Sequence, residues 1–346
     1  MVFAAIMGTK IIAPNIWGWI ADHTGKRMRI VRIASILSLL SFVGIFISQE
    51  YYILLWIMIV FSFFWNANLP QFEAVTLSHL GKDTHKYSSI RLWGSLGFVV
   101  LVTILGGTFE YYSVDLLPMV IVFLLAGIWV FSLLVPDHPV HHVEKASISF
   151  KKKLFTPEVM IFFLICFLLQ ASHGPYYAFY SIYLEQNEYP RSLIGQLWAL
   201  GVIAEIFIFI IMHKLLPKFG AAALLIVCLV LTALRWFLIA YYVDSFSIIL
   251  FAQCLHAASF GIFHAVAIHQ IHRYFPGKLQ GRGQALYSSL SFGAGGAFGA
   301  LYSGWVWEGY GATWAYNVAG IIGIAALLCS LLYKHLCVRQ NHLESN

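Results

Sequence analysis

Two charged side chains lie near the middle of long apolar runs. Glu205 is close to the centre of the run 191–213, and Arg235 is close to the centre of the run 220–242. An unpaired charge at the centre of a membrane helix costs roughly 2.5–3.5 kcal/mol, so each residue is expected to face a partner or a hydrated cavity. A carboxyl group beside a guanidinium group that can move is able to bind and release a proton. The alternative is a static ion pair that fixes the packing of two helices.

Two histidines of the run 245–271 could belong to the same site. His256 and His264 are eight positions apart, which is about 80° around an ideal α-helix, so both could border one cavity. Imidazole groups suit proton transfer near neutral pH. His264 is the stronger candidate because it lies toward the inner half of its run. For each histidine the alternative is a single hydrogen-bonded side chain within a helix bundle.

Glu73 ends an unusually polar stretch of the run 52–78. Two asparagines and a glutamine precede it, and Asn68 is one of them. Polar runs of this kind are tolerated in a membrane helix only where they line protein or water. Glu73 is therefore a candidate for a second protonation or gating site, and a salt bridge with Arg91 that anchors a loop is the alternative.

A further basic residue and a polar aromatic segment could contact a ligand. Lys10 lies in the run 1–21 and, together with Arg235, could receive a carboxylate, which makes an organic anion plausible. The run 158–184 carries polar groups beside flat apolar faces that suit an aromatic or sugar ring. The candidate ligand-binding residues are Lys10, Asn68, Gln170, His173, Tyr176, Tyr177, Tyr180 and His256.

The composition places these residues in a multi-pass membrane protein. Of the 346 residues 60% are hydrophobic and 10% are charged, whereas soluble proteins average about 25% charged residues. Eleven apolar runs are long enough to cross a hydrocarbon core of about 30 Å. They are 1–21, 31–48, 52–78, 91–109, 115–135, 158–184, 191–213, 220–242, 245–271, 283–307 and 312–336. No nucleophile and base pair, no spacing typical of metal ligands and no cofactor motif accompanies them, so an enzyme is not expected.

The distribution of charge predicts the topology. When Lys26 and Arg27 are placed on the cytoplasmic side of the membrane, Arg191 is the only one of the 21 Lys and Arg residues that falls in an outer turn. This agrees with the positive-inside rule and predicts a cytoplasmic C-terminus. The net charge of +6 is then a signal of topology, and no nucleic-acid partner is expected.

A long polar connection separates two parts of the chain. The predicted divisions are an N-terminal half of five helices (1–136), a cytoplasmic linker (137–157), a C-terminal half of six helices (158–338) and a cytoplasmic tail (339–346). Three histidines in the linker could in principle bind a metal, but solvated side chains are the simpler interpretation, and no metal site is predicted.

The two halves resemble each other in sequence. Shifts of 194 or 195 positions align Gly25 with Gly220, Lys10 with Glu205, and 91–98 with 285–292. An internal duplication predicts two related helical halves with a ligand site between them near the middle of the membrane. Nothing precedes Met1 to match the run 158–184, so we expect this chain to lack the first helix of a twelve-helix protein.

The turn between the first two runs has a distinctive spacing. Gly18, Asp22, Gly25, Lys26 and Arg27 follow the pattern G-x-x-x-D-x-x-G-[RK]-[RK]. Gly25 permits a sharp reversal and the basic residues hold the turn inside. The pattern resembles the loop signature of major facilitator superfamily transporters. The segments 91–98, 168–183 and 197–209 resemble the phenylpropionate permease branch, which is similar to the lactose permease group of proton symporters.

The resemblance implies an all-α membrane protein with a major facilitator fold of two pseudo-symmetric halves. It implies a secondary transporter of the bacterial inner membrane, active as a monomer, that imports a small organic solute with protons by alternating access. An aromatic carboxylate such as 3-phenylpropionate is the expected substrate, and a sugar or nucleoside is the alternative. A non-transporting fragment or sensor is the alternative from another class. The lactose permease group also carries Glu, Arg and His on successive helices, in the order of Glu205, Arg235 and His264.

Overall fold

The computed structural model describes the backbone of residues 1–48, 50–80, 87–137, 150–276 and 279–344. Within these ranges all regular structure is helical, which confirms the predicted all-α class. Several residues named in the sequence analysis or counted in the predicted topology have a backbone or a side chain that the structure does not describe. They are Asp22, Arg91, the linker histidines His138, His141 and His142, and the basic residues Lys82, Lys86, Lys145, Lys278 and Arg339. The other side chains outside the description are those of Leu77, 87–89, 280–281 and 338–344.

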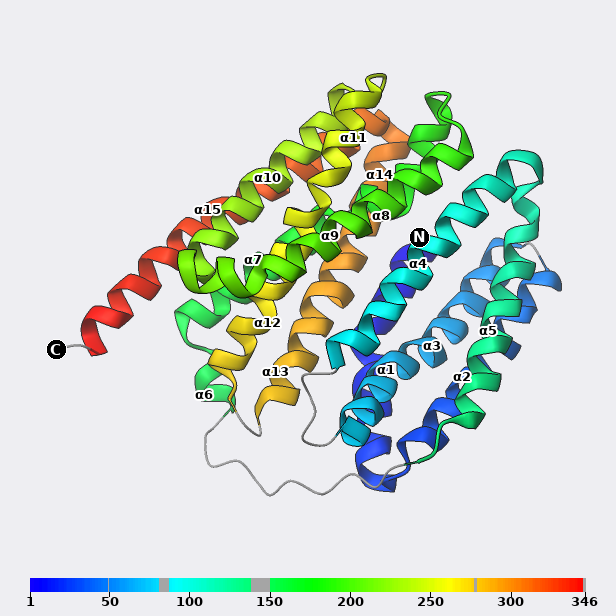
Figure 1. Cartoon of the computed structure of the whole chain (residues 1–346), viewed down its shortest axis with the longest axis horizontal. Helices are drawn as coiled ribbons and strands as arrows, with labels where there is room; N and C mark the ends of the chain where they lie inside the picture. The colour runs from blue at the N-terminus through cyan, green and yellow to red at the C-terminus, as the bar shows by residue number, and fades with distance from the viewer. Residues whose placement is uncertain (49, 81–86, 138–149, 277–278, 345–346) are drawn as a thin grey trace. The chain divides into compact units, whose positions relative to one another are not determined.

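The first five apolar runs form separate helices because each backbone amide in hydrocarbon must be satisfied within its own segment. They are α1 (Val2–Thr24), α2 (Arg27–Val43), α3 (Tyr51–Leu80), α4 (Tyr87–Tyr111) and α5 (Leu117–Leu134) (Figure 1). A short 3-10 turn at Gly44–Phe46 follows α2, and another at Val114–Leu116 precedes α5.

The later runs form longer helical segments, several of which are interrupted. A short helix α6 (Phe150–Leu154) precedes α7 (Pro157–Ser172), α8 (Gly174–Gln186), α9 (Arg191–Phe219), α10 (Ala221–Tyr241), α11 (Phe246–Cys254), α12 (Phe263–Tyr274), α13 (Gln280–Tyr287), α14 (Gly296–Tyr310) and α15 (Ala312–Glu344). The π-helical segments Ala257–Ile262 and Ser288–Gly295 join α11 to α12 and α13 to α14. Such segments often mark functional sites in helices.

The eleven predicted runs all coincide with helices, although their hydropathy differs. In the part of the chain that the structure describes, nine segments are long and apolar enough to cross a membrane. The helix α1 and the segment from α13 to α14 are not among these nine. Lys10 interrupts the apolar sequence of α1, and glycine and serine are frequent between α13 and α14.

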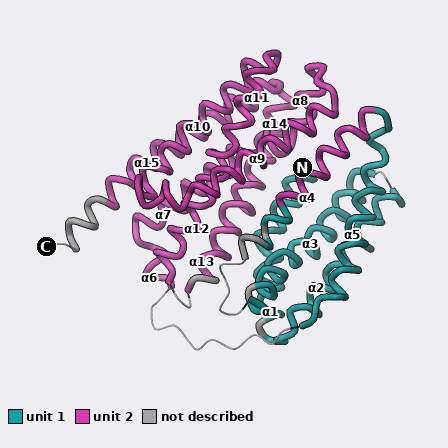
Figure 2. The backbone as a smooth tube through the Cα atoms, viewed as in Figure 1, with its two compact units in different colours: residues 1–94, 111–143 teal, residues 95–110, 144–346 magenta. Residues whose placement is uncertain are grey.

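The chain divides into two compact units (Figure 2). One contains Met1–Gly94 and Tyr111–Val143, and the other contains Ser95–Glu110 and Glu144–Asn346. The predicted N-terminal half (1–136) assigns the whole of α4 to the first part of the chain, so the two divisions differ at Ser95–Glu110. In the second unit one apolar core lies among α7, α10, α12 and α15, and an aromatic core around Tyr176, Trp236 and Tyr316 lies among α8, α10 and α15.

Glycines allow two helices of the second unit to touch through their backbones. A Cβ atom added at Gly174 in α8 would overlap the carbonyl oxygen of Gly299 in α14. A Cβ atom added at Gly299 would lie 2.6 Å from the carbonyl oxygen of Ala171. Neither position has room for a methyl group, so the separation of these helices depends on both glycines.

We expect Gly174→Ala to lower the free energy of unfolding by about 1–3 kcal/mol, because the methyl group forces α8 and α14 apart. Thermal unfolding of the purified protein in detergent measures this loss. Gly304→Ala is the matched control in α14, since a Cβ atom added there meets nothing within 4 Å. Equal unfolding midpoints for the two variants would contradict the prediction.

Candidate functional site

A buried arginine organises the polar interior of the second unit. Arg235 in α10 is fully buried. It donates through Nε to the Ala252 carbonyl oxygen (3.0 Å), through Nη1 to Ser259 Oγ (3.0 Å) and His256 Nδ1 (3.1 Å), and through Nη2 to Gln253 Oε1 (2.9 Å). Its guanidinium carbon also lies 4.1 Å from the ring centre of Tyr176 and 4.8 Å from that of Trp236. Neutral acceptors and aromatic faces therefore stabilise the charge.

Gln253 connects Arg235 to two other helices. Its Nε2 donates to the hydroxyl of Tyr176 in α8 (3.0 Å) and to the carbonyl oxygen of Leu197 in α9 (2.9 Å). Because its Oε1 accepts from Arg235, the orientation of the amide group is fixed by three partners. The network thus joins α8, α9, α10 and α11 and holds the guanidinium group in one position.

His256 lies between Arg235 and Glu205. A guanidinium group can only donate, so Nδ1 of His256 accepts from Arg235 and the ring proton is assigned to Nε2. That nitrogen lies 3.7 Å from Oε2 of Glu205, whose side chain is 14% exposed. The predicted pair of Glu205 and Arg235 is therefore brought together through an imidazole that sequence reasoning ranked below His264.

The π-helical segment Ala257–Ile262 shapes this arrangement. A Cβ atom added at Gly261 would overlap Cγ2 of Ile208, so glycine lets α9 approach this segment closely. The rings of His256, Phe260 and His264 stack in order, with centroid separations of 5.6 and 5.7 Å and interplanar angles of 15° and 4°. The offset of about 80° expected for an ideal α-helix does not apply, because a π-helical segment holds more residues per turn.

His264 sits at the other end of this stack. Its Nδ1 lies 3.4 Å from the hydroxyl oxygen of Tyr287. Its ring also faces Phe209 and Phe292 at centroid separations of 6.4 Å each. His264 is thus in the same polar and aromatic column as His256, about two helical turns away across the π-helical segment Ala257–Ile262.

The aromatic segment predicted to bind a ligand surrounds the break between α7 and α8. His173 occupies the break, with Nδ1 2.8 Å from the Leu169 carbonyl oxygen and its ring stacked on Tyr177 at 5.7 Å. The Nε2 atom of His173 and the hydroxyl group of Tyr180 are buried without a hydrogen-bond partner among the described residues. These two polar atoms, together with the buried Gln170, can accept a hydrogen bond from, or donate one to, a small molecule or water.

The remaining candidates lie in the first unit. Lys10 in α1 is half-buried and has no hydrogen-bond or ion-pair partner among the residues that the structure describes. Asn68 in α3 is buried and accepts a hydrogen bond from Ser35 (3.2 Å), whereas its Nδ2 has no partner within that part of the chain. Glu73 is half-buried further along α3.

The turn signature shows how its residues join helices. Gly25 ends α1 with φ of 65°, and the aligned Gly220 has φ of 74°, a conformation that favours glycine. Arg27 at the start of α2 donates to Gln71 Oε1 in α3 (2.7 Å). Gly18 is inside α1, Lys26 is exposed and the side chain of Asp22 is outside the description.

Sequence reasoning missed the residues that complete the Arg235 network. Gln253 and Ser259 each contact the guanidinium group. Their signal was present, because Gln253 and Ser259 each lie three positions from His256 and are therefore close to it on the helix surface. Thr9 and Ser62 were missed as well, and they form a second polar cluster between α1 and α3 with Asn66, which belongs to the predicted polar stretch before Glu73.

Comparison with known proteins gives consistent matches over most of the chain. A protein of Escherichia coli (strain K12) named as a probable 3-phenylpropionic acid transporter is 26% identical over 328 residues, which is 92% of this chain and 83% of that protein. The maltose permease of Geobacillus stearothermophilus is 24% identical over 91% of this chain and 81% of the permease. The crystal structure of a mutant of the nucleoside transporter NupG has a TM-score of 0.84 at 16% identity, covering 96% of this chain and 89% of that chain.

These relatives are transporters and not enzymes, so the helices described above form a multi-pass membrane transporter for a small molecule. The NupG comparison confirms the major facilitator fold. The profile of the MFS_1-like family matches residues 1–318, and with most of its length covered the chain belongs to that family.

Proposed function

We propose that the chain is a proton symporter that imports a small organic solute across the bacterial inner membrane by alternating access. In this proposal it works as a monomer with its C-terminus in the cytoplasm. The observation that supports it best is the succession of a buried guanidinium, a neutral imidazole and a carboxyl group. Arg235, His256 and Glu205 are joined by separations of 3.1 and 3.7 Å.

The charges of this arrangement suggest how proton and solute binding are coupled. Arg235 stays protonated, so an ionised Glu205 compensates it through His256. When Glu205 binds a proton, the site keeps one uncompensated positive charge in a poorly solvated region, which is costly. An anionic solute would restore neutrality, so a proton and an anion favour each other's binding. His264 and Glu73 are proposed as further groups along the proton route.

The aromatic core favours an aromatic carboxylate as the solute. The unpartnered Nε2 of His173 and hydroxyl of Tyr180 can hydrogen-bond it beside the rings of Tyr176 and Tyr177. Four hydrogen bonds already occupy Arg235, so its charge attracts the carboxylate without a direct bond, and Lys10 is proposed as a further contact. The remaining proposed contacts are Asn68, Gln170 and His256.

The names of the relatives support this first choice and one alternative. The Escherichia coli relative is named for 3-phenylpropionic acid. The maltose permease and the nucleoside transporter favour a sugar or nucleoside instead. Those solutes are uncharged, so they would leave the positive charge beside a protonated Glu205 uncompensated.

Uptake of labelled 3-phenylpropionate into cells with and without the protein tests the proposal. Passive entry of the protonated acid is subtracted with the cells that lack it. We expect saturable accumulation that a protonophore abolishes and that unlabelled acid inhibits, whereas the neutral amide analogue does not. Uptake that survives the protonophore would contradict proton coupling, and equal inhibition by the amide would contradict carboxylate recognition. Uptake of maltose or uridine alone would support the alternative, and no uptake of any solute would support a non-transporting protein.

A further inference from the structure

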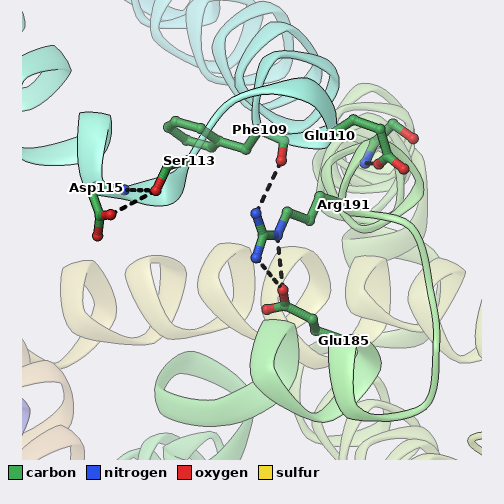
Figure 3. Close-up of polar contacts among 7 residues, drawn as sticks. Phe109, Glu110, Ser113, Asp115, Glu185 and Arg191 are labelled. Carbon is green, nitrogen blue, oxygen red and sulfur yellow. Dashed lines mark hydrogen bonds and ion pairs between the residues drawn. The ribbon is translucent and has the colours of Figure 1, made fainter.

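A single guanidinium group joins three helices at one end of the second unit. Arg191 is the first residue of α9, and its Nε and Nη2 donate to Oε1 of Glu185 in α8 at 2.8 and 2.5 Å. Its Nη1 donates to the carbonyl oxygen of Phe109 in α4 at 3.1 Å. Figure 3 shows the guanidinium group between these two acceptors. The Arg191 side chain therefore connects α4 to both α8 and α9.

A second bond between α4 and α9 is independent of Arg191. Oε2 of Glu110 accepts a hydrogen bond from the backbone N–H of Ser192 at 3.0 Å. This N–H is one of the first amides of α9, which lack partners within their own helix. The preceding Pro190 supplies no side-chain cap. The carboxylate of Glu110 takes that role from the neighbouring helix, where the helix dipole also favours a negative charge.

Next to these bonds the backbones of α4 and α9 are in contact. A Cβ atom added at Gly106 would lie 2.9 Å from the carbonyl oxygen of Arg191, and one added at Gly195 would overlap that of Val102. With hydrogen in place of a side chain, α4 and α9 can meet without interdigitated side chains. Such a smooth contact can be separated and reformed without side chains changing rotamer.

The polar bonds themselves are weak enough to be reversible. The side chains of Arg191 and Glu185 are 39% and 48% exposed, and exposed ion pairs contribute little to stability. Arg191 is also the only Lys or Arg residue that the predicted topology places outside. The bonds to Glu185 and to the Phe109 carbonyl group explain why a basic residue lies on the outer side, where the positive-inside rule does not favour it.

We propose that Arg191 is the positioning residue of a latch, formed with Glu185, Glu110 and the Phe109 carbonyl group, that closes the outer ends of α4 and α9 in one state of the transport cycle. The latch opens in the other state. The helix α4 precedes the linker 137–157 and α9 follows it, and alternating access requires the parts on either side of that linker to separate at one end. The inference rests on the proposed transport by alternating access but not on the identity of the solute.

Distances between spin labels test the latch without any solute. Labels are placed at Tyr111→Cys and Tyr242→Cys, which are 87% and 51% exposed. The five native cysteines, none of them in a disulfide within the described chain, are replaced by serine or alanine. Arg191→Gln is expected to raise the fraction of molecules with the longer distance about three- to tenfold, because the fork of donors is lost. Glu110→Gln is expected to do the same to a smaller extent, since its amide oxygen is a weaker cap.

Two further variants separate a latch from a general structural role. Arg191→Lys keeps the charge without the fork and should give an intermediate fraction. Glu308→Gln changes an exposed carboxyl group elsewhere and should leave the distances unchanged. Identical distances in Arg191→Gln and the parent would overturn the latch, and so would uniform broadening without a second distance. A shifted distance in a protein that takes up no solute would leave the latch standing and refute the proposed symport instead.

Discussion

Cells that express Glu205→Gln are expected to equilibrate the solute without accumulating it. Glutamine keeps the shape of the side chain that faces His256 Nε2 at 3.7 Å and one acceptor oxygen, but it cannot bind and release a proton. With one proton carried per anion, a pH difference of about one unit supports about tenfold accumulation, since each unit corresponds to about 1.36 kcal/mol. The variant should therefore lose about tenfold in its steady-state ratio of internal to external solute.

The same variant should retain exchange of labelled for unlabelled solute, because exchange needs the binding site but no net proton movement. Accumulation and exchange are measured on the same vesicles with an imposed pH gradient. Glu308→Gln is the matched control, because the same chemical change is made at an exposed carboxyl group of α14. Normal accumulation by Glu205→Gln would exclude this residue as the proton carrier. Loss of exchange as well would assign it to solute binding.

Local composition was sufficient to predict the helices of this protein. Membrane helices satisfy their backbone groups within one segment, so apolar length predicts where most of them begin and end. It did not predict the break at His173, or that α9 and α15 continue past 213 and 336 to Phe219 and Glu344. The turn at Gly25 was predictable for a similar reason, because its φ of 65° is a conformation that glycine adopts readily. Intramembrane charges at Glu205 and Arg235 were equally visible, since their cost marks them in any apolar run.

The geometry that connects those charges could not be predicted from spacing. The π-helical segment Ala257–Ile262 changes the angular relation between His256 and His264, and no residue type in it demands that conformation. The close approach of α9 to Gly261 also depends on tertiary packing, which the spacing of residues in the sequence does not indicate. His256 therefore lies between Arg235 and Glu205, although an ideal α-helix gave no reason to prefer it.

The latch between α4 and α9 was also beyond sequence reasoning. Glu110 reads as an ordinary residue of an outer turn, and the bonds that join α4 to α9 are made by Glu110 to a backbone N–H and by Arg191 to a backbone carbonyl group. Backbone groups carry no sequence signal, so only the positions of the helix ends reveal such bonds. The sequence indicates only that Arg191 is the single exception to the positive-inside rule. Counting charges does not explain that exception.

Arg235→Gln is expected to lower the free energy of unfolding by about 3–5 kcal/mol. Four donor contacts disappear together, to the Ala252 carbonyl group, Ser259, His256 and Gln253. The shorter glutamine side chain cannot replace them, so buried acceptors stay unsatisfied. Transport should be abolished even in the fraction that folds, because Nδ1 of His256 loses the donor that sets its tautomer. Thermal unfolding and solute exchange measure the two effects.

Arg235→Lys distinguishes the charge of this residue from its geometry. If charge alone mattered, lysine would restore stability and coupling, since it is also a cation. The ammonium group has three donors on one atom, whereas the acceptors of Arg235 surround a planar group that also lies 4.1 Å from the ring centre of Tyr176. Lysine cannot reach all of them or stack on that ring, so it should recover only part of the stability and little transport. Full recovery by lysine would show that the network requires only the positive charge at position 235 and not the planar geometry of the guanidinium group. The fixed tautomer of His256 would then have no role in coupling.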